Sequence, residues 1–349
     1  MKSKVNRHEA QLYKRLDSAR VRCDLCEHRC VIEDGQLGIC GVRENSGGTL
    51  YTLVYGRTIA RHVDPVEKKP LFHFHPGSEA YSMATPGCNF TCAWCQNWQI
   101  SQMPRERDIV AGEAFTPEQI VADARRLNCH SIAYTYTEPT VFFEYAHDTA
   151  RIAHEHGLAN FFISNGYMSE EMLAIIEPYL DAVNIDLKAF RDETYREYVG
   201  ARLKPILRNL ERIKQLGIWL EVTTLVIPGI NDSESELRDT AAFIVENLGA
   251  ETPWHISRFF PNYRMDGIPP TPAKTLVRAH EIGIEAGLHY VYLGNTGEGE
   301  DTFCHQCGKR LIERHGYRIV ANLIAPDSSC PDCGAKVAGI GMGAASLST

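Results

Sequence analysis

The chain has 349 residues, of which 44% are hydrophobic and 23% are charged, and its formal net charge is −8. This length and composition are typical of a globular protein with one large domain and smaller additions. No apolar run approaches the roughly 20 residues that a membrane helix needs, and the first residues lack the apolar core of an export signal, so we expect a cytoplasmic protein without a membrane partner. The negative charge does not indicate nucleic-acid binding.

The twelve cysteines form three groups and leave one single residue. Because no export signal precedes them, metal binding or redox use is a better interpretation than a disulfide framework. The single residue, Cys129, precedes an apolar run and is interpreted as a small buried side chain.

Residues 1–20 are predicted to form a polar helix or arm with a thin apolar stripe. The first cysteine group follows with the spacing Cys-x2-Cys-x3-Cys-x9-Cys, and it consists of Cys23, Cys26, Cys30 and Cys40. Four thiolates suit either a structural zinc ion or a four-ligand iron–sulfur cluster, and the spacing alone does not choose between them. His28 could replace one thiolate, and reduced cysteines without metal are the remaining alternative.

The second group lies in a loop after a β-like run and a Thr-Pro-Gly turn, and it contains Cys88, Cys92 and Cys95. Three thiolates can hold three irons of a cubic cluster and leave the fourth iron open, whereas clusters that only transfer electrons use four cysteines. The missing ligand therefore indicates a cluster that binds a further molecule. Trp94 precedes the last cysteine and could pack on the cluster or on a flat ligand.

From residue 80 to about residue 294, strand patterns alternate with helical patterns about six times. The predicted strands cover residues 131–137, 158–163, 182–188, 219–227, 253–259 and 289–293. The predicted helices cover residues 116–127, 141–156, 169–179, 205–217, 233–248 and 271–287. This order predicts a parallel sheet covered by helices. A partial (β/α) barrel fits better than a dinucleotide-binding sheet, because no G-x-G-x-x-G follows a strand.

Polar residues collect at the ends of the predicted strands, which is the face that holds the chemistry in α/β barrels. The residues at or near these ends are Cys88, Glu138, Asn165, Asp186, Lys188 and His255.

The third cysteine group consists of two Cys-x2-Cys-Gly turns, formed by Cys304 and Cys307 and by Cys330 and Cys333. Two such turns make a tetrahedral site that zinc fills without redox liability, so we predict a zinc-ribbon-like module with a small β-ribbon between the turns. The chain is thus predicted to divide into an N-terminal arm and Cys₄ module at 1–78, a partial barrel at 79–296, and a C-terminal Cys₄ module and tail at 297–349.

Taken together, the three-cysteine loop and the strand pattern resemble the radical S-adenosylmethionine (radical SAM) superfamily, in particular the branch of the pyruvate formate-lyase activating enzyme. The first cysteine block, the segment at 64–70 and the Tyr136-Thr-Glu-Pro139 segment are similar to the radical SAM enzyme of the AmmeMemoRadiSam system. This resemblance covers residues from about 20 to 300.

The resemblance implies a 4Fe–4S cluster on Cys88, Cys92 and Cys95, with S-adenosylmethionine bound to the open iron through its amino and carboxylate groups. It implies one-electron reduction by an external donor such as flavodoxin or ferredoxin, and a 5′-deoxyadenosyl radical that abstracts hydrogen. A protein is one substrate class, through glycyl-radical or other side-chain activation, and a small molecule or RNA remains open.

The resemblance also implies roles for single residues. Glu138 matches the acidic end of the Gly-Gly-Glu motif, where a carboxylate can bond the cofactor's ammonium, although Tyr136 and Thr137 replace the glycines. Asn165 matches part of an Asp-Thr-Asn-Gly loop whose aspartate is replaced by Ile163.

Asp186 and Lys188 match an Asp-Leu-Lys segment that either orients the cofactor or substrate or forms a structural ion pair. An arginine of that branch is replaced by Thr223, so His255 or Arg258 is the candidate partner of the cofactor carboxylate.

The alternative function is that of a non-catalytic adaptor whose cysteine groups are structural metal sites. The three-cysteine loop argues against it, because a closed structural site takes four ligands.

Overall fold

The computed structural model describes residues 7–343, which form two compact units. Within these residues, the first unit comprises 7–64, Glu79–Asp181 and Arg196–Asn209, and the second comprises Pro65–Ser78, Ala182–Tyr195 and 210–343. The predicted domain boundaries at 78 and 296 stay predictions.

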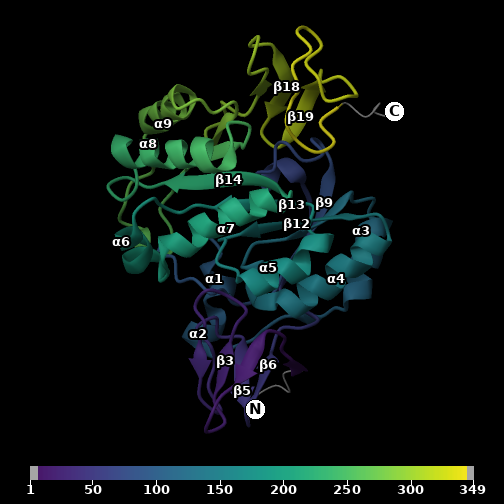
Figure 1. Ribbon diagram of the computed structural model, residues 1–349, viewed down its shortest axis with the longest axis vertical. Coiled ribbons are helices and arrows are strands. Elements are labelled where there is room, and N and C mark those ends of the chain that lie inside the picture. Colours follow the sequence, from purple (N-terminus) through teal and green to yellow (C-terminus); the bar gives the residue numbers. More distant parts are fainter. Residues whose placement is uncertain (1–6, 344–349) are drawn as a thin grey trace. The chain divides into compact units, whose positions relative to one another are not determined.

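The N-terminal part of the first unit is built from short antiparallel strands (Figure 1). Their bounds are β1 His8–Glu9, β2 Tyr13–Arg15, β3 Val21–Cys23, β4 Val31–Ile32, β5 Arg43–Ser46 and β6 Thr49–Thr52. They form two three-stranded sheets, ordered β2-β3-β4 and β1-β6-β5. The predicted N-terminal helix is therefore wrong for the described residues of 1–20, and residues 1–6 lie outside the described range. The pairing of β1 with β6 and of β2 with β3 outweighs the weak helical periodicity of the apolar residues in this segment.

The remainder of the first unit carries a run of parallel strands. The strand order is β8-β9-β11-β12, in which β9, β11 and β12 are parallel and the edge strand β8 runs antiparallel to β9. The bounds are β8 Ala60–Pro65, β9 Glu79–Ala84, β11 Ser131–Tyr134 and β12 Ala159–Ser164. A further two-stranded pair joins β7 Arg57–Thr58 to β10 Glu113–Ala114. Because β9, β11 and β12 are parallel, their carboxyl ends lie at one edge, where the three-cysteine loop and the segments after β11 and β12 meet.

The second unit carries the parallel strands β13, β14, β15 and β16, in that order. Their bounds are β13 Ala182–Asp186, β14 Trp219–Val226, β15 Trp254–Arg258 and β16 Val291–Gly294. In both units the order is open, so the described strands form no closed barrel, in keeping with the predicted partial one.

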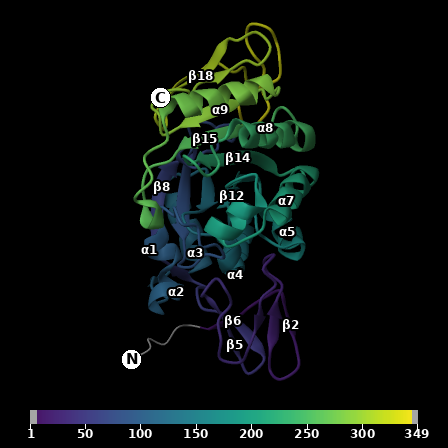
Figure 2. The same cartoon turned by 90° about the vertical axis from the view of Figure 1, so that its left-hand side faces the viewer.

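Helices follow the strands along the chain as predicted. Their bounds are α1 Trp98–Ser101, α2 Met103–Arg107, α3 Pro117–Arg126, α4 Phe143–Glu155, α5 Glu170–Ile176, α6 Asp192–Thr194, α7 Leu203–Gln215, α8 Glu234–Phe243 and α9 Ala273–Glu285. Helix α3 begins at a capping box in which Thr116 and Gln119 bond each other's backbone N–H groups, with Pro117 at the first helical position. Within the second unit, α8 and α9 lie side by side (Figure 2). None of the helices that the structure describes is long and apolar enough to cross a membrane.

The C-terminal ribbon of the second unit has three antiparallel strands, β17 Thr302–Phe303, β18 Arg310–His315 and β19 Arg318–Asn322. Its buried side chains share one core with Phe72, Tyr290 and Tyr292. The predicted β-ribbon between the two cysteine turns is thus present.

Candidate active site and metal centres

The three-cysteine loop follows β9 and is held by close packing within the first unit. Gly87 has a φ of +101°, and a Cβ at this position would lie 2.7 Å from Cγ1 of Val42 and 3.1 Å from the carbonyl oxygen of Cys40. Farther along the loop, the N–H groups of Thr91 and Ala93 each donate a 2.9 Å hydrogen bond to the carbonyl oxygens of Val199 and Tyr198 respectively. A glycine is therefore required directly before Cys88, since a side chain there would clash with the N-terminal module.

The loop sulfurs have polar neighbours but do not form a single-ion site. Cys88 Sγ accepts from the Phe90 N–H at 3.4 Å, and Cys95 Sγ lies 3.3 Å from Oγ of Ser101. Burial, and after it the charge of Glu138, raise the pKa of the Cys88 thiol well above its ordinary value. A cation bound at this sulfur would offset that cost, because metal binding favours the thiolate.

Glu138 lies in the segment after β11, directly before the 3₁₀ helix Pro139–Phe142, and is 1% exposed. Its Oε1 accepts from Thr140 N at 3.0 Å, from Thr140 Oγ1 at 2.6 Å and from Ser164 Oγ at 2.8 Å. Its Oε2 accepts from Asn165 N at 2.9 Å. The carboxylate therefore fastens the segment after β12 to the segment after β11. Its direct contact with a cofactor stays a prediction.

Asn165 connects this carboxylate to the cysteine loop. Its Nδ2 donates to Asn89 Oδ1 at 2.8 Å and lies 3.9 Å from Cys88 Sγ, while its Oδ1 accepts from the Tyr167 N–H at 3.0 Å. The structure thus brings together Cys88, Glu138 and Asn165, which the sequence placed at successive strand ends.

Tyr136 occupies the place of a glycine in the expected motif and adopts a glycine-like conformation, with a φ of +62°. This left-handed conformation costs a side chain about 1–2 kcal/mol. The Tyr136 hydroxyl donates to Asp64, and the Tyr136 carbonyl accepts from Asn97 Nδ2 at 2.7 Å, so neighbouring groups offset the strain. Tyr136 therefore keeps a conformation that glycine favours, although it carries a side chain.

Trp94 is 4% exposed, and its ring centroid lies 6.5 Å from that of Tyr198. Its side chain is thus buried within the first unit, and its predicted packing against a cluster or ligand stays a prediction.

The donor set of the loop fits an iron–sulfur cluster with one open iron. Three thiols come from one loop. A single ion needs sulfurs that all lie within about 4.8 Å of one another, and within residues 7–343 the sulfurs of this loop do not form such a set. A cubic cluster is larger than an ion and separates its thiolates further. The residues that would hold it are Cys88, Cys92 and Cys95.

Asp186 and Lys188 belong to the second unit, at the end of β13. Lys188 Nζ and Asp186 Oδ2 form an ion pair of 2.7 Å, and the Lys188 carbonyl accepts from Asn231 Nδ2 at 2.8 Å. The structural ion pair that the sequence allowed is present, and a role in orienting a ligand stays a prediction.

His255 also lies in the second unit, on β15, and its Nε2 is 2.6 Å from Oε2 of Glu221. Glu221 on β14 is fully buried and also accepts from the N–H groups of Phe72 at 3.0 Å and His73 at 2.8 Å. The other candidate for the cofactor carboxylate, Arg258, donates its Nε to the Thr271 carbonyl at 2.8 Å.

The C-terminal cysteine group has the geometry of a closed tetrahedral site. The sulfurs of Cys304 and Cys333 are 3.6 Å apart, those of Cys307 and Cys330 are 3.7 Å apart, and all four lie within 4.8 Å of one another. A Zn–S bond of about 2.3 Å places the sulfurs of a tetrahedron roughly 3.8 Å apart. The site therefore fits one metal ion, and zinc remains a proposal for its identity.

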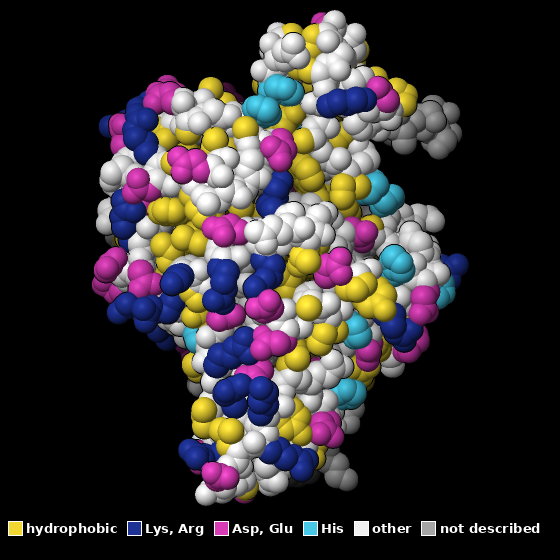
Figure 3. Space-filling view, viewed as in Figure 1, with side chains coloured by type: hydrophobic (Ala, Val, Ile, Leu, Met, Phe, Trp, Pro, Cys, Tyr) yellow, Lys and Arg dark blue, Asp and Glu magenta, His cyan; other side chains and the backbone are white. Residues whose placement is uncertain are grey.

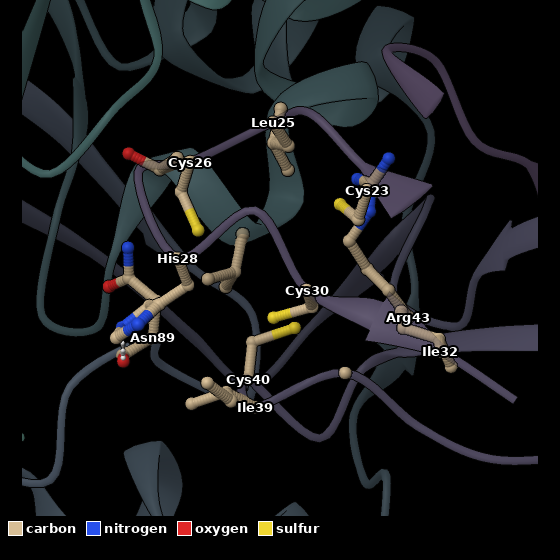
Figure 4. Close-up of a pocket in the computed structure, with 13 residues that line it drawn as sticks. Cys23, Leu25, Cys26, His28, Cys30, Ile32, Ile39, Cys40, Arg43 and Asn89 are labelled. Carbon is tan, nitrogen blue, oxygen red and sulfur yellow. Dashed lines mark hydrogen bonds between the residues drawn. The ribbon is translucent and has the colours of Figure 1, made fainter. Parts of the chain in front are cut away.

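The N-terminal cysteine group lines a cavity in the first unit. Figure 4 shows Cys23, Cys26, Cys30 and Cys40 around it, with His28 and Asn89 at its edge. His28 Nε2 lies 2.8 Å from the Asn89 carbonyl oxygen, so this nitrogen is occupied by a backbone hydrogen bond.

Sequence reasoning missed four residues that shape these sites, namely Asn89, Thr140, Ser164 and Glu221. Thr140 and Ser164 are close in sequence to predicted strand ends, which was the available signal. Asn89 and Glu221 act through partners far along the chain, and no local pattern identifies them.

Comparison with known proteins places these features in a family. Residues 83–244 match the family described as the Radical SAM superfamily. A protein of Methanocaldococcus jannaschii that is itself named only as uncharacterized is 46% identical over 332 residues, which cover 94% of this chain and 98% of that protein.

A putative glycyl-radical enzyme activating enzyme of the same organism is 24% identical over 240 residues, which cover 67% of this chain and 86% of that protein. Among solved structures, a domain of the pyruvate-formate lyase-activating enzyme from Bacteroides vulgatus aligns with a TM-score of 0.42 and 17% identity, over 47% of this chain and 99% of that one.

Proposed function

Because the chain belongs to the radical SAM superfamily, we propose that it is an enzyme that activates a protein by abstracting a hydrogen atom from one of its side chains or glycines. The family membership confirms the predicted resemblance to radical SAM enzymes. It also argues against the alternative hypothesis of a non-catalytic adaptor. The narrower likeness to the AmmeMemoRadiSam enzyme stays a prediction. The single observation that carries the proposal is the loop with three buried or half-buried cysteines and no fourth at the end of β9.

When bound, the 4Fe–4S cluster and S-adenosylmethionine supply reductive C–S cleavage, which yields methionine and a 5′-deoxyadenosyl radical that takes a hydrogen atom. The chain's own part is to hold and orient. Cys88, Cys92 and Cys95 supply the thiolates. Asn165 keeps Cys88 in place, and Glu138 fixes Asn165 through its backbone N–H.

The protein substrate is supported by a relative's name and not by a docking surface. The putative activating enzyme of Methanocaldococcus jannaschii covers 67% of this chain, and an enzyme of that name acts on another enzyme. An external one-electron donor of the flavodoxin or ferredoxin type fits the same proposal. On the face shown in Figure 3, basic and acidic side chains are interspersed, so charge on that face does not indicate a nucleic-acid substrate.

The first experiment tests the reaction class. The protein is reconstituted with iron and sulfide without oxygen, then given dithionite and S-adenosylmethionine, and 5′-deoxyadenosine is measured. We expect turnover in the wild type and in Cys129→Ser, whose cysteine lies outside all three groups, and none in the Cys88→Ala, Cys92→Ala, Cys95→Ala triple variant. Equal production by the triple variant would disprove the assignment of the loop.

The second experiment tests the substrate class. An extract of cells grown in heavy water, in which all three classes of molecule carry deuterium, is separated into proteins, RNA and small molecules, and each fraction is added to the reaction. Deuterium in 5′-deoxyadenosine after addition of the protein fraction alone is the expected result. Deuterium that appears only with the small molecules or only with the RNA would contradict a protein substrate.

A further inference from the structure

The cavity of the N-terminal cysteines differs from the C-terminal metal site in the distance between its sulfurs. All four C-terminal sulfurs lie within 4.8 Å of one another, and within residues 7–343 no three of the N-terminal cysteines form such a set. All four N-terminal cysteines are free of disulfide bonds. The group is therefore assembled around one space but is too wide for a single tetrahedral ion.

The space between these cysteines has an apolar lining. Apart from the cysteines, its walls are formed largely by apolar groups such as Leu25, Ile32 and Val141. Figure 4 shows the four cysteine side chains around this space. The wide spacing of the four sulfurs in an apolar surrounding suits a cluster of several atoms better than one zinc ion.

Two buried N–H donors at the same cavity have no partner among the described residues. Asn89 and Arg43 both line it and are each 1% exposed. Asn89 Nδ2 and Arg43 Nε lack a hydrogen-bond partner. A buried donor left unpaired costs about 1–3 kcal/mol, so such groups ordinarily have one. Sulfide or thiolate acceptors would satisfy them, and hydrogen bonds to sulfur are among the factors that tune iron–sulfur clusters.

We propose that Cys23, Cys26, Cys30 and Cys40 hold a second iron–sulfur cluster of the four-iron type, accompanied by N–H donors from Asn89 and Arg43. A cluster with four thiolates has no open iron, so it exchanges single electrons and does not bind S-adenosylmethionine. This inference is independent of the proposed reaction, because it concerns a separate group of ligands.

The two cysteine groups are joined by direct packing within the first unit. Asn89, which follows Cys88, lines the N-terminal cavity and accepts a hydrogen bond from His28 at 2.8 Å. Gly87, which precedes Cys88, faces the Cys40 carbonyl oxygen at close range. The second cluster would therefore lie beside the first one, where an electron can pass between them.

Iron content and spectroscopy test the inference on the full chain. The wild type, reconstituted with ⁵⁷Fe, should hold about eight irons per chain, and the Cys88→Ala, Cys92→Ala, Cys95→Ala variant about four. The Mössbauer spectrum of that variant should be that of a four-iron cluster, and its reduced electron paramagnetic resonance signal should not change when S-adenosylmethionine is added. Cys129→Ser is the control and should hold as much iron as the wild type.

The reciprocal variant, Cys26→Ser with Cys30→Ser, should keep about four irons whose reduced electron paramagnetic resonance signal does change with S-adenosylmethionine.

If the triple alanine variant holds no iron and the wild type holds two zinc ions, the inference is wrong, whether or not the reciprocal variant folds. If all iron resides on the N-terminal cysteines, the inference stands and the proposed function fails. If all iron resides on the three-cysteine loop, the inference fails and the proposed function stands.

Discussion

The carboxylate of Glu138 accepts four hydrogen bonds from three residues, although it lies almost completely out of solvent. Burial raises its pKa, and the backbone and hydroxyl donors oppose that shift. The residue is thus a positioning group whose effect on Cys88 runs through Asn165.

We expect Glu138→Gln to destabilise the protein and to weaken S-adenosylmethionine cleavage. Either orientation of the new amide points its NH₂ group at an existing donor, and each donor left unpaired costs about 1–3 kcal/mol. Thermal melting and 5′-deoxyadenosine production measure the two effects. The matched control is Glu171→Gln, because Glu171 pairs with Arg29 at the surface of the same unit and should change stability by about 1 kcal/mol or less.

A Glu138→Gln protein that melts like the wild type but no longer binds S-adenosylmethionine would contradict the positioning role. It would instead favour the direct cofactor contact that the sequence suggested.

Single residues could be predicted from the sequence where their chemistry is local. The spacing of Cys88, Cys92 and Cys95 lies within one loop, so this ligand set could be proposed from the sequence alone. The pairing of His255 with Glu221 joins two strands, and the bond between Asn165 and Asn89 spans 76 positions. Such contacts depend on the packing of the sheet, so no sequence spacing predicts them.

At the scale of secondary-structure elements, a buried ion pair joins strand β5 to helix α4. Arg43 donates to both carboxylate oxygens of Glu144, at 3.0 and 2.9 Å, and the two side chains are 2% and 1% exposed. Gln11 donates its backbone N–H to the same carboxylate at 2.7 Å. The N-terminal strands are thereby fastened to a helix that lies about a hundred residues later in the chain.

We expect Arg43→Met to destabilise the protein by about 3–5 kcal/mol, because it leaves the Glu144 carboxylate buried and unpaired. The double variant Arg43→Met with Glu144→Gln should recover part of this loss, since the buried charge is removed while an acceptor for Gln11 remains. Arg151→Met, which breaks an exposed pair with Glu155 on α4, is the control and should cost roughly 0.5 kcal/mol.

Melting temperatures measure these differences. They are compared at equal iron content, because Arg43 also lines the N-terminal cavity. A double variant that is no more stable than Arg43→Met would show that the loss comes from packing and not from the unpaired charge.

The elements after residue 80 could be predicted because apolar periodicity, helix-capping residues and helix-ending glycines indicate the same element boundaries there. Thr116, Pro117 and Gln119 mark the start of α3 in the sequence, and the structure has the same capping box. The N-terminal strands are only two to four residues long and are stabilised by pairing and by the cysteine turns. Strands this short carry too little periodicity to be distinguished from an arm or a helix.

At the scale of the whole molecule, the chain divides its cysteine groups between its units. The two cysteine groups with wide spacing are in the first unit, and the compact tetrahedral group is in the second. The sequence indicated three groups, because each has a local spacing. It could not distinguish iron from zinc at the N-terminal group, because that distinction depends on how far apart folding holds the sulfurs.

We therefore expect a substitution in one cysteine group to change the zinc content or the iron content of the chain, but not both. Cys307→Ser removes one thiolate from the tetrahedral site, so zinc should fall from about one ion per chain to well below one, while iron stays unchanged. His305→Ala is the matched control, because His305 lies between Cys304 and Cys307 and stacks on His289 at 4.2 Å without completing the tetrahedron. Metal analysis by mass spectrometry, on protein purified without oxygen, measures both contents.

Stability should follow the zinc, because the ribbon shares its core with Phe72, Tyr290 and Tyr292 of the second unit. Loss of the metal would loosen β17 and β18 from these side chains, so Cys307→Ser should also lower the melting temperature, whereas His305→Ala should not. If Cys307→Ser lowers iron in proportion to zinc, the C-terminal group binds iron, and the division of metals between the units is wrong.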